Sequence, residues 1–192
     1  ITIANERIYT ADTDGMNWPS QSTRVSVVDI NSFEFEKTIT VSLNPNYIYS
    51  DSDGDVYVIC MSDYSDDKSY IVQRIDAKTD EVKTVEGIKA YKMTVADDIA
   101  YIMFNDYYAN EVKYYKYDLK NEKLLSDNFI TDGTVVSSPN GIGVDPVTGD
   151  IYVGKSNKKN NGDVYVFSSE GKLKSQFETL PYPADFVFMT NK

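Results

Sequence analysis

The most informative stretch of the sequence is the short apolar run Val56-Tyr57-Val58-Ile59. It recurs in related form at three other places, as Arg7-Ile8-Tyr9-Thr10, Ala100-Tyr101-Ile102-Met103 and Ile151-Tyr152-Val153-Gly154. The four tyrosines, at positions 9, 57, 101 and 152, are 48, 44 and 51 residues apart. A period of this length is typical of proteins in which one supersecondary unit is repeated along the chain.

Each repeat contains four short segments in the same order. The tyrosine run is followed by an alternating run at 25–29, 71–76, 113–118 and 163–168, and then by a more polar run at 35–41, 81–85, 123–130 and 172–177. A short apolar segment follows at 47–49, 93–95, 142–144 and 186–188. Period-two alternation with turn residues between the segments predicts β-strands, and no capped helical stretch interrupts them.

Four short antiparallel strands in each repeat of 44 to 51 residues match one blade of a β-propeller. The sequence therefore predicts an all-β propeller with blades at about 1–42, 43–87, 88–131 and 132–179, and a closing inner strand at 180–192. The apolar segments are expected to be innermost, and the charged runs outermost because outer strands meet solvent. A β-sandwich is the alternative fold, although it does not predict a fourfold repeat.

The two ends of the chain both read as innermost strands. The segment 1–9 aligns with 93–101 without a gap, which places Ile1 inside an inner strand, and 186–188 is an inner segment with no later strands beside it. Because propellers avoid a free edge by closing the ring, we expect this chain to be part of a longer propeller. A self-contained ring of four blades is the alternative.

Composition excludes several classes of function. With 19 basic and 30 acidic residues, the formal net charge is −11, so a nucleic acid is not expected as a partner. No apolar run approaches the ~18 residues of a membrane helix. The chain has no histidine, and its single cysteine, Cys60, lies in an apolar run and is expected to be buried and inert. We predict no cofactor and no metal.

The last quarter of the chain carries a family resemblance. It rests on Ser138-Pro139-Asn140-Gly141-Ile142-Gly143-Val144-Asp145-Pro146-Val147-Thr148-Gly149-Asp150, on Gly162-Asp163-Val164-Tyr165, on Gly171-Lys172-Leu173-Lys174 and on Pro183-Ala184-Asp185-Phe186-Val187-Phe188. Together these segments resemble the YncE-like, DUF5074-type propeller lipoproteins of Gram-negative gut bacteria. The resemblance implies that this chain is part of a seven-bladed propeller, and that the protein is lipid-anchored at the cell surface or in the periplasm. One similar protein captures cobalamin and passes it to an outer-membrane transporter.

Acidic clusters have a structural and a chemical interpretation. Asp51-Ser52-Asp53-Gly54-Asp55 resembles a calcium loop in composition, but its glycine and its later ligands are misplaced for an EF-hand, so a tight turn is favoured. Asp29, Asp76 and Asp118 occupy one repeat position. We expect each of them to accept N–H bonds within its own turn.

The longest loops, at 11–24, 61–70, 105–111 and 155–162, are expected on one face of the propeller, beside the loops that lead into the inner strands. Aromatic and amide side chains on a rigid scaffold suit a binding surface, and packing of loop against loop is the alternative interpretation. The candidate ligand-binding residues there are Trp18, Tyr64, Tyr91, Asn105, Tyr107, Tyr108, Asn140, Tyr182 and Asp185.

Three functions are compatible with these features. The first is a non-catalytic extracytoplasmic binding propeller for a small molecule, a corrinoid or a glycan, that is handed to an outer-membrane transporter. The second is a scaffold for protein–protein interaction at the cell surface. The third and least favoured is a calcium-dependent, lactonase-like hydrolase, since no Ser-His-Asp set is possible without histidine.

Overall fold

The computed structural model describes residues 1–18, 21–63, 70–106 and 111–189. Its secondary structure is almost entirely β, and the one helix in these ranges is a single 3₁₀ turn at Gly15–Asn17. No helix in the described part of the chain is long and apolar enough to cross a membrane. The chain divides into two compact units, Ile1–Tyr91 and Lys92–Lys192, which are called the first and the second unit below.

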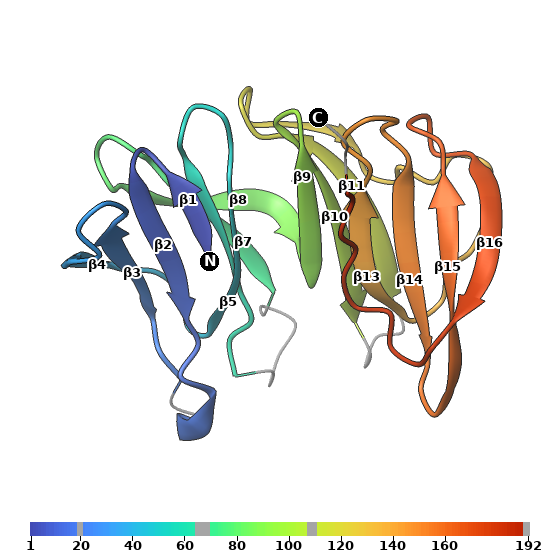
Figure 1. Cartoon of the computed structure of the whole chain (residues 1–192), viewed down its shortest axis with the longest axis horizontal. Helices are drawn as coiled ribbons and strands as arrows, with labels where there is room; N and C mark the ends of the chain where they lie inside the picture. The colour runs from blue at the N-terminus through green and yellow to red at the C-terminus, as the bar shows by residue number, and fades with distance from the viewer. Residues whose placement is uncertain (19–20, 64–69, 107–110, 190–192) are drawn as a thin grey trace. The chain divides into compact units, whose positions relative to one another are not determined.

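The first unit contains two four-stranded antiparallel sheets, each a simple meander (Figure 1). The first sheet consists of β1 (Thr2–Ala4), β2 (Arg7–Asp12), β3 (Arg24–Asp29) and β4 (Phe35–Thr40), and the second of β5 (Pro45–Ser50), β6 (Val56–Cys60), β7 (Ile71–Ile75) and β8 (Val82–Lys89). The inner strand β5 of the second sheet lies against β1 and β2 of the first. The first residues of the chain are expected from the sequence to form an inner strand, and this strand is β1.

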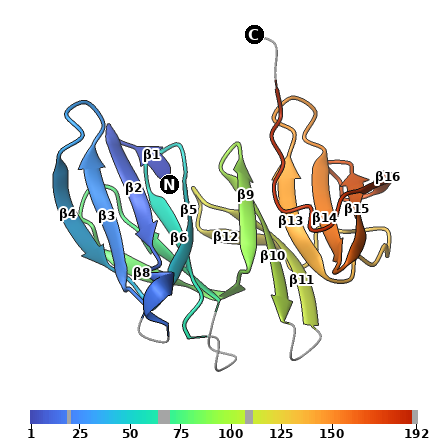
Figure 2. The ribbon, with the colours of Figure 1, turned by 60° about the horizontal axis from the view of Figure 1, so that its bottom comes forward.

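The second unit repeats this arrangement (Figure 2). Its sheets consist of β9 (Lys92–Ala96), β10 (Ile99–Asp106), β11 (Glu111–Asp118) and β12 (Lys123–Ser126), and of β13 (Pro139–Val144), β14 (Ile151–Asn157), β15 (Asn160–Phe167) and β16 (Leu173–Thr179). The inner strand β13 lies against β9 and β10, as β5 does against β1 and β2. Four sheets of four antiparallel strands confirm the repeat inferred from the sequence.

The four repeat tyrosines occupy equivalent positions in the second strand of each sheet. Tyr9 pairs with Val27, Tyr57 with Arg74, Tyr101 with Lys116 and Tyr152 with Val166. Each partner precedes by two residues the polar residue that ends its strand or directly follows it, Asp29, Asp76, Asp118 or Ser168. The prediction of equivalent second-strand positions is therefore confirmed.

Apolar residues of both sheets form the core of the first unit. Its buried members are Ala4, Tyr9, Val25, Val27, Ile39, Val41, Ile48, Val56, Val58, Cys60 and Ile75. They come from alternate positions of the strands, because successive side chains of a strand point to opposite faces. Burying one large apolar side chain of this kind stabilises the fold by about 1.5–3 kcal/mol.

The recurring aspartates close the turns between third and fourth strands, as predicted. The Asp29 carboxylate accepts the N–H groups of Asn31 (2.9 Å) and Ser32 (2.7 Å). Asp76 accepts those of Lys78 (3.0 Å) and Thr79 (2.9 Å), and Asp118 accepts that of Asn121 (2.9 Å). The pKa values of all three carboxyl groups lie below the usual value for aspartate. The main cause is the bond from the Ser32 N–H at Asp29, the bond from the Lys78 N–H at Asp76, and the bond from the Asn121 side chain at Asp118.

Acid is expected to destabilise the protein through these turns. Because the carboxyl pKa is lower in the folded chain than in the unfolded one, the contribution to stability is fully present above the unfolded pKa of about 3.9. It is lost as the pH falls through the lower folded value. The free energy of unfolding from urea titrations should therefore be smaller at about pH 3 than at about pH 6. Asp29→Asn, which keeps an acceptor oxygen but cannot titrate, should reduce this difference.

Glu86→Gln is the control for this experiment, because Glu86 is exposed and its loss also removes one negative charge. An equal change of the pH dependence in both variants would mean that net charge, and not the turn, causes the response to acid.

The segment after β16 differs from the expectation. The sequence predicts a closing inner strand at 180–192, whereas residues 181–189 belong to no strand. They lie instead in extended form along β13 (Figures 1 and 2). The segment joins no ladder of the described strands, and its contacts with β9, β13 and β14 are made through side chains and carbonyl groups.

Glycines make room for this segment on the sheet. A Cβ atom at Gly141 or Gly154 would come within 2.6 or 2.5 Å of the Pro183 carbonyl oxygen, and one at Gly143 within 2.7 Å of Phe186 Cβ. The ring of Phe188 packs edge-on against Tyr152, with centroids 5.1 Å apart. Such close approach of another backbone is one of the uses of glycine within a strand.

Candidate functional site

A cavity of about 350 Å³ lies beside the beginning of β11, within the second unit. We call it the edge cavity. It is lined by Val112, Lys113 and Tyr114 of β11, by Asp127, Asn128 and Ile130 after β12, and by Thr134, Val135, Val136 and Ser137 of the following loop. The cavity is therefore bounded by one strand and by the connection that leads from β12 to β13.

The edge cavity exists because β12 ends early. In the other three sheets, the outermost strand reaches the beginning of the third strand, pairing Thr40 with Arg24, Lys89 with Ile71 and Thr179 with Gly162. The last pair of β12 is Ser126 with Lys116, which leaves the first half of β11 with a single parallel bridge from Tyr114 to Asn128. The sequence predicts an outer strand over 123–130. In the structure this strand ends at Ser126, so the prediction is wrong for 127–130.

The missing half of β12 leaves backbone groups of β11 free to bind. The Tyr114 carbonyl accepts the Phe129 N–H (2.8 Å) on the side away from β10. Because hydrogen-bonding directions alternate along an antiparallel strand, Val112 directs its N–H and C=O to this same side. No residue of the described ranges pairs with Val112 there.

Buried aromatic and aliphatic side chains form the floor of the edge cavity. Tyr114 is 6% exposed, and its hydroxyl donates to the Val136 carbonyl (2.8 Å). Its ring packs edge-on against Phe129, with centroids 5.3 Å apart. Burial raises the pKa of Tyr114 well above its usual value, so this side chain is a neutral hydrogen-bond donor and not an acid at physiological pH.

The outer wall is fastened to the turn between β15 and β16. The Thr131 N–H donates to the Gly171 carbonyl (2.9 Å), and the Thr131 hydroxyl donates to the Glu170 carbonyl (2.8 Å). The Leu173 N–H in turn donates to Asp132 (2.7 Å). These three bonds hold residues 131–132 away from β11, so the connection cannot collapse into the cavity.

The rim of the edge cavity carries charges of both signs. Lys113 Nζ lies 2.9 Å from Glu111 Oε1, and this hydrogen bond is the main reason that the pKa of Lys113 is raised. Asp127 also lines the cavity, within electrostatic reach of Lys113. Glu111 directly precedes the lining residue Val112, so this end of the cavity has two acidic residues and one basic residue and is acidic in balance, as the whole chain is.

Three candidate residues from the sequence lie in the second unit and hold the backbone. The Asn105 amide donates to the Pro139 carbonyl and the Asn140 amide to the Pro183 carbonyl, both at 3.4 Å. Asp185 Oδ1 lies 3.0 Å from Nζ of Lys92, which is buried on β9 and also donates to the Ala184 carbonyl (2.5 Å). These side chains position the loop before β13 and the segment after β16.

The aromatic candidates are divided between the two units. Trp18 and Tyr182 are exposed, at 64% and 55%, in the first and the second unit respectively. Tyr91, in the first unit, has its ring 6.4 Å from that of Tyr70. The candidates Tyr64, Tyr107 and Tyr108 lie outside the described residues. A role for these tyrosines in binding stays a prediction.

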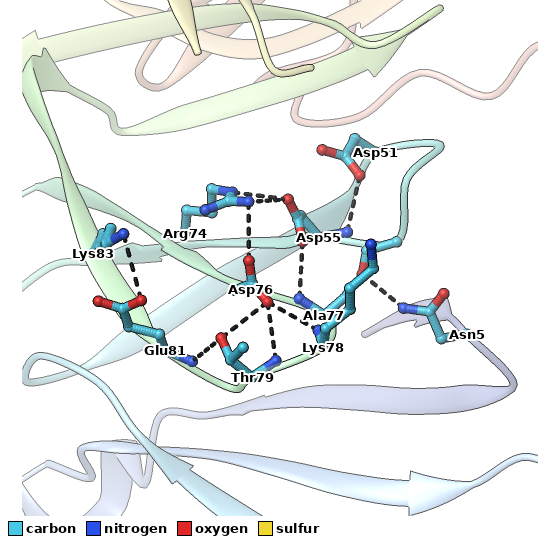
Figure 3. A network of polar contacts seen from close by, with 11 residues as sticks. Asn5, Asp51, Asp55, Arg74, Asp76, Ala77, Lys78, Thr79, Glu81 and Lys83 are labelled. Atoms are coloured by element: carbon cyan, nitrogen blue, oxygen red, sulfur yellow. Dashed lines mark hydrogen bonds and ion pairs between the residues drawn. The ribbon is translucent and has the colours of Figure 1, made fainter. Parts of the chain in front are cut away.

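The acidic stretch 51–55 forms a tight turn, as predicted. Asp51 accepts the Asp55 N–H through its side chain (2.9 Å), and the Gly54 N–H donates to the Asp51 carbonyl (3.3 Å). The Asp55 carboxylate binds Arg74, whose guanidinium also reaches Asp76 (3.3 Å), as Figure 3 shows. These oxygens are thus engaged by the chain itself, and the described residues contain no group of three or more possible metal ligands.

Cys60 is buried on β6, as expected from its apolar run. Burial raises the pKa of its thiol to about 12, so the reactive thiolate is absent at physiological pH.

Sequence reasoning did not identify the residues of the edge cavity. The available signal was Asp127-Asn128, two residues that favour turns, inside the stretch expected to be an outer strand. The partners that turn this interruption into a cavity, Thr131 and Gly171, are far apart in sequence.

No protein-family model matches the sequence, and no curated protein matches it. Solved structures do match its fold. Hydrazine synthase of Kuenenia stuttgartiensis superposes with a TM-score of 0.62 at 14% identity, over 88% of this chain and 50% of that one. The Dos1 propeller superposes with a TM-score of 0.64 at 13% identity, over 94% of this chain and 46% of that one. The chain thus spans about half the length of each, and its fold is that of a β-propeller.

Proposed function

We propose that the protein is a non-catalytic binding propeller and that the edge cavity is a ligand site of its second unit. The observation that carries the proposal is a cavity of about 350 Å³ whose floor and wall are held open by bonds within the chain. A pre-formed concave site with an apolar floor and a few polar groups is the usual form of a ligand site.

The size of the cavity bears on the ligand. Ligand pockets span roughly 300–1,000 Å³, and the edge cavity lies near the lower end of this range. It therefore favours a group the size of a side chain or a single sugar ring over the macrocycle of a corrinoid. The family resemblance adds the proposal that the protein works outside the cytoplasm as a lipid-anchored protein and delivers its ligand to an outer-membrane transporter.

The absence of catalysis is part of the proposal. The chain contains no histidine to act as a general base at neutral pH, and its cysteine is protonated and buried. Asp29, Asp76 and Asp145, whose pKa values are lowered, are engaged with N–H groups of their own turns, and Asp132 is engaged with the Leu173 N–H. These groups stabilise the fold and are not poised for proton transfer.

Filling the cavity is expected to abolish binding. Thr134 is half-buried in the wall, and Thr134→Phe should occupy the space that a ligand needs. In calorimetric titrations with cobalamin, with defined oligosaccharides and with short peptides, at least one probe should bind the original protein. Its affinity should fall at least about tenfold in the variant, equivalent to about 1.4 kcal/mol.

Thr134→Val is the matched control, because it removes the hydroxyl without adding volume, and it should bind as the original protein does. Heat with none of the probes, or affinity that Thr134→Phe leaves unchanged, would contradict the assignment of the ligand site to the edge cavity.

A further inference from the structure

We propose that the edge cavity takes an extended peptide of a partner protein, which adds to β11 as the missing end of β12. This inference rests on the proposed function, since it names the ligand class of the same site. Addition of a strand to an open sheet edge is a general mode of peptide recognition, in which backbone bonds supply affinity and a side-chain pocket supplies specificity.

The backbone of β11 determines how the peptide would pair. Val112 directs both its N–H and its C=O away from β10, and no described residue satisfies them from that side. An antiparallel peptide residue opposite Val112 would exchange two hydrogen bonds with it. Its direction would be that of β12, which is also antiparallel to β11.

The register then assigns side chains to positions. The peptide residue opposite Val112 lies on the same face of the sheet as Val112 and Tyr114, whose side chains alternate with that of Lys113. This face carries the floor of the edge cavity, so an apolar, β-branched side chain is required there. The next peptide residue stands opposite Glu111.

Charge favours a basic peptide. Glu111, which directly precedes the cavity residue Val112, and Asp127, which lines the cavity, outnumber Lys113, and the chain as a whole carries a net charge of −11. A lysine or arginine opposite Glu111 would face an opposite charge across the strand pair, which is stabilising, whereas a glutamate there would face a like charge. The expected partner segment is therefore extended, with an apolar β-branched residue followed by a basic one.

The architecture of the other sheets supports the same conclusion. Where β4, β8 and β16 reach the first residues of the third strand or come within two residues of them, the corresponding edge is already occupied by the chain. At β11 the chain leaves instead toward the β15–β16 turn, where three hydrogen bonds hold it. The open edge of β11 and the cavity beside it thus have the same cause, which is the early end of β12.

The test uses the peptide acetyl-Thr-Val-Lys-amide, whose residues would stand opposite Lys113, Val112 and Glu111, and nuclear magnetic resonance titration of the ¹⁵N-labelled protein. Binding should shift the amide signals of Val112, Tyr114 and Val136. Methylation of the peptide's valine nitrogen keeps the side chain but removes one hydrogen bond, and it should weaken binding by about tenfold, the upper end for a single neutral bond. Replacing the peptide's lysine by glutamate should also weaken binding.

On the protein, Val112→Pro removes the outward N–H without removing a bond to β10, and it should weaken peptide binding by about tenfold. Val112→Thr keeps the N–H and a similar shape, and should bind normally. Circular dichroism and the melting temperature show whether both variants are folded. If Val112→Pro does not fold, the methylated peptide tests the same hydrogen bond on the original protein.

The outcomes separate the two proposals. Equal binding of the methylated and unmethylated peptides would overturn strand addition. Binding of an oligosaccharide or cobalamin, blocked by Thr134→Phe, together with no binding of the peptide, would overturn the peptide and retain the ligand site. If no probe binds, the proposed function and this inference both fail.

Discussion

Gly171→Ala is expected to lower the free energy of unfolding by more than about 3 kcal/mol. Gly171 has a φ of +79°, where a side chain costs about 1–3 kcal/mol. A Cβ atom at this position would also lie 1.7 Å from the Phe129 carbonyl oxygen, so the backbone must move. The movement breaks the bond from the Thr131 N–H to Gly171. Urea unfolding of the variant and the original protein measures the loss.

Gly133→Ala is the matched control, because it separates the cost of a side chain on a left-handed backbone from the cost of the steric clash. Gly133 lies in the connection from β12 to β13, which the Gly171 turn holds, and has a φ of +81°, but nothing lies within 4 Å of a Cβ atom built there. Gly133→Ala should lower the free energy of unfolding by only about 1–2 kcal/mol, which is the cost of the left-handed backbone. Equal losses in the two variants would mean that the approach of Phe129 to Gly171 does not constrain the structure.

The second large effect is expected from Asp55→Ala, which should cost about 2–3 kcal/mol. The Asp55 carboxylate accepts Nε of Arg74 (2.8 Å) and the Ala77 N–H (2.8 Å), and it also bonds Nη2 of Arg74 (Figure 3). The two side chains are only 15% and 17% exposed. Removing one partner of a buried ion pair costs about 3–5 kcal/mol, and this pair, partly exposed and shared with Asp76, should lie below that range.

The contrasting variant is Glu36→Ala, which breaks the ion pair between Glu36 and Arg7 (2.8 Å). These side chains are 28% and 35% exposed, and the loss should stay within about 1 kcal/mol. Unfolding midpoints in urea compare the two variants. Similar losses would show that burial does not strengthen the Asp55–Arg74 pair. Calcium should leave the melting temperature of the original protein unchanged, since the oxygens of 51–55 are already engaged.

The strand order and the turns were predictable because their causes are local. Alternation of apolar and polar residues predicts the strands that contain Tyr9, Tyr57, Tyr101 and Tyr152, and it does so without any knowledge of the neighbouring strands. The turns at Asp29 and Asp76 need only an acceptor side chain and the two N–H groups that follow it. The recurrence of these features every 44 to 51 residues then identifies the fold.

The candidate residues were predictable only in part. Asn105 and Asn140 fall at the loop ends expected from the repeat, but their amides bind carbonyl groups of the chain. An amide in a loop has the same sequence signature whether it serves a ligand or the backbone. The segment 181–189 likewise has the alternation of a strand, yet it joins no ladder and packs on glycines of β13 and β14.

Strand identity, strand order and turn chemistry therefore follow from the sequence alone, since dihedral preferences, alternation and side-chain caps act over a few residues. The edge cavity does not. It depends on where β12 stops pairing, on the bonds that draw Thr131 to Gly171, and on the absence of a Cβ atom at Gly171. These contacts join segments that are distant in the chain, and the free energy of bringing such segments together depends on the whole packed unit, so only the tertiary structure decides that β11 has an open edge.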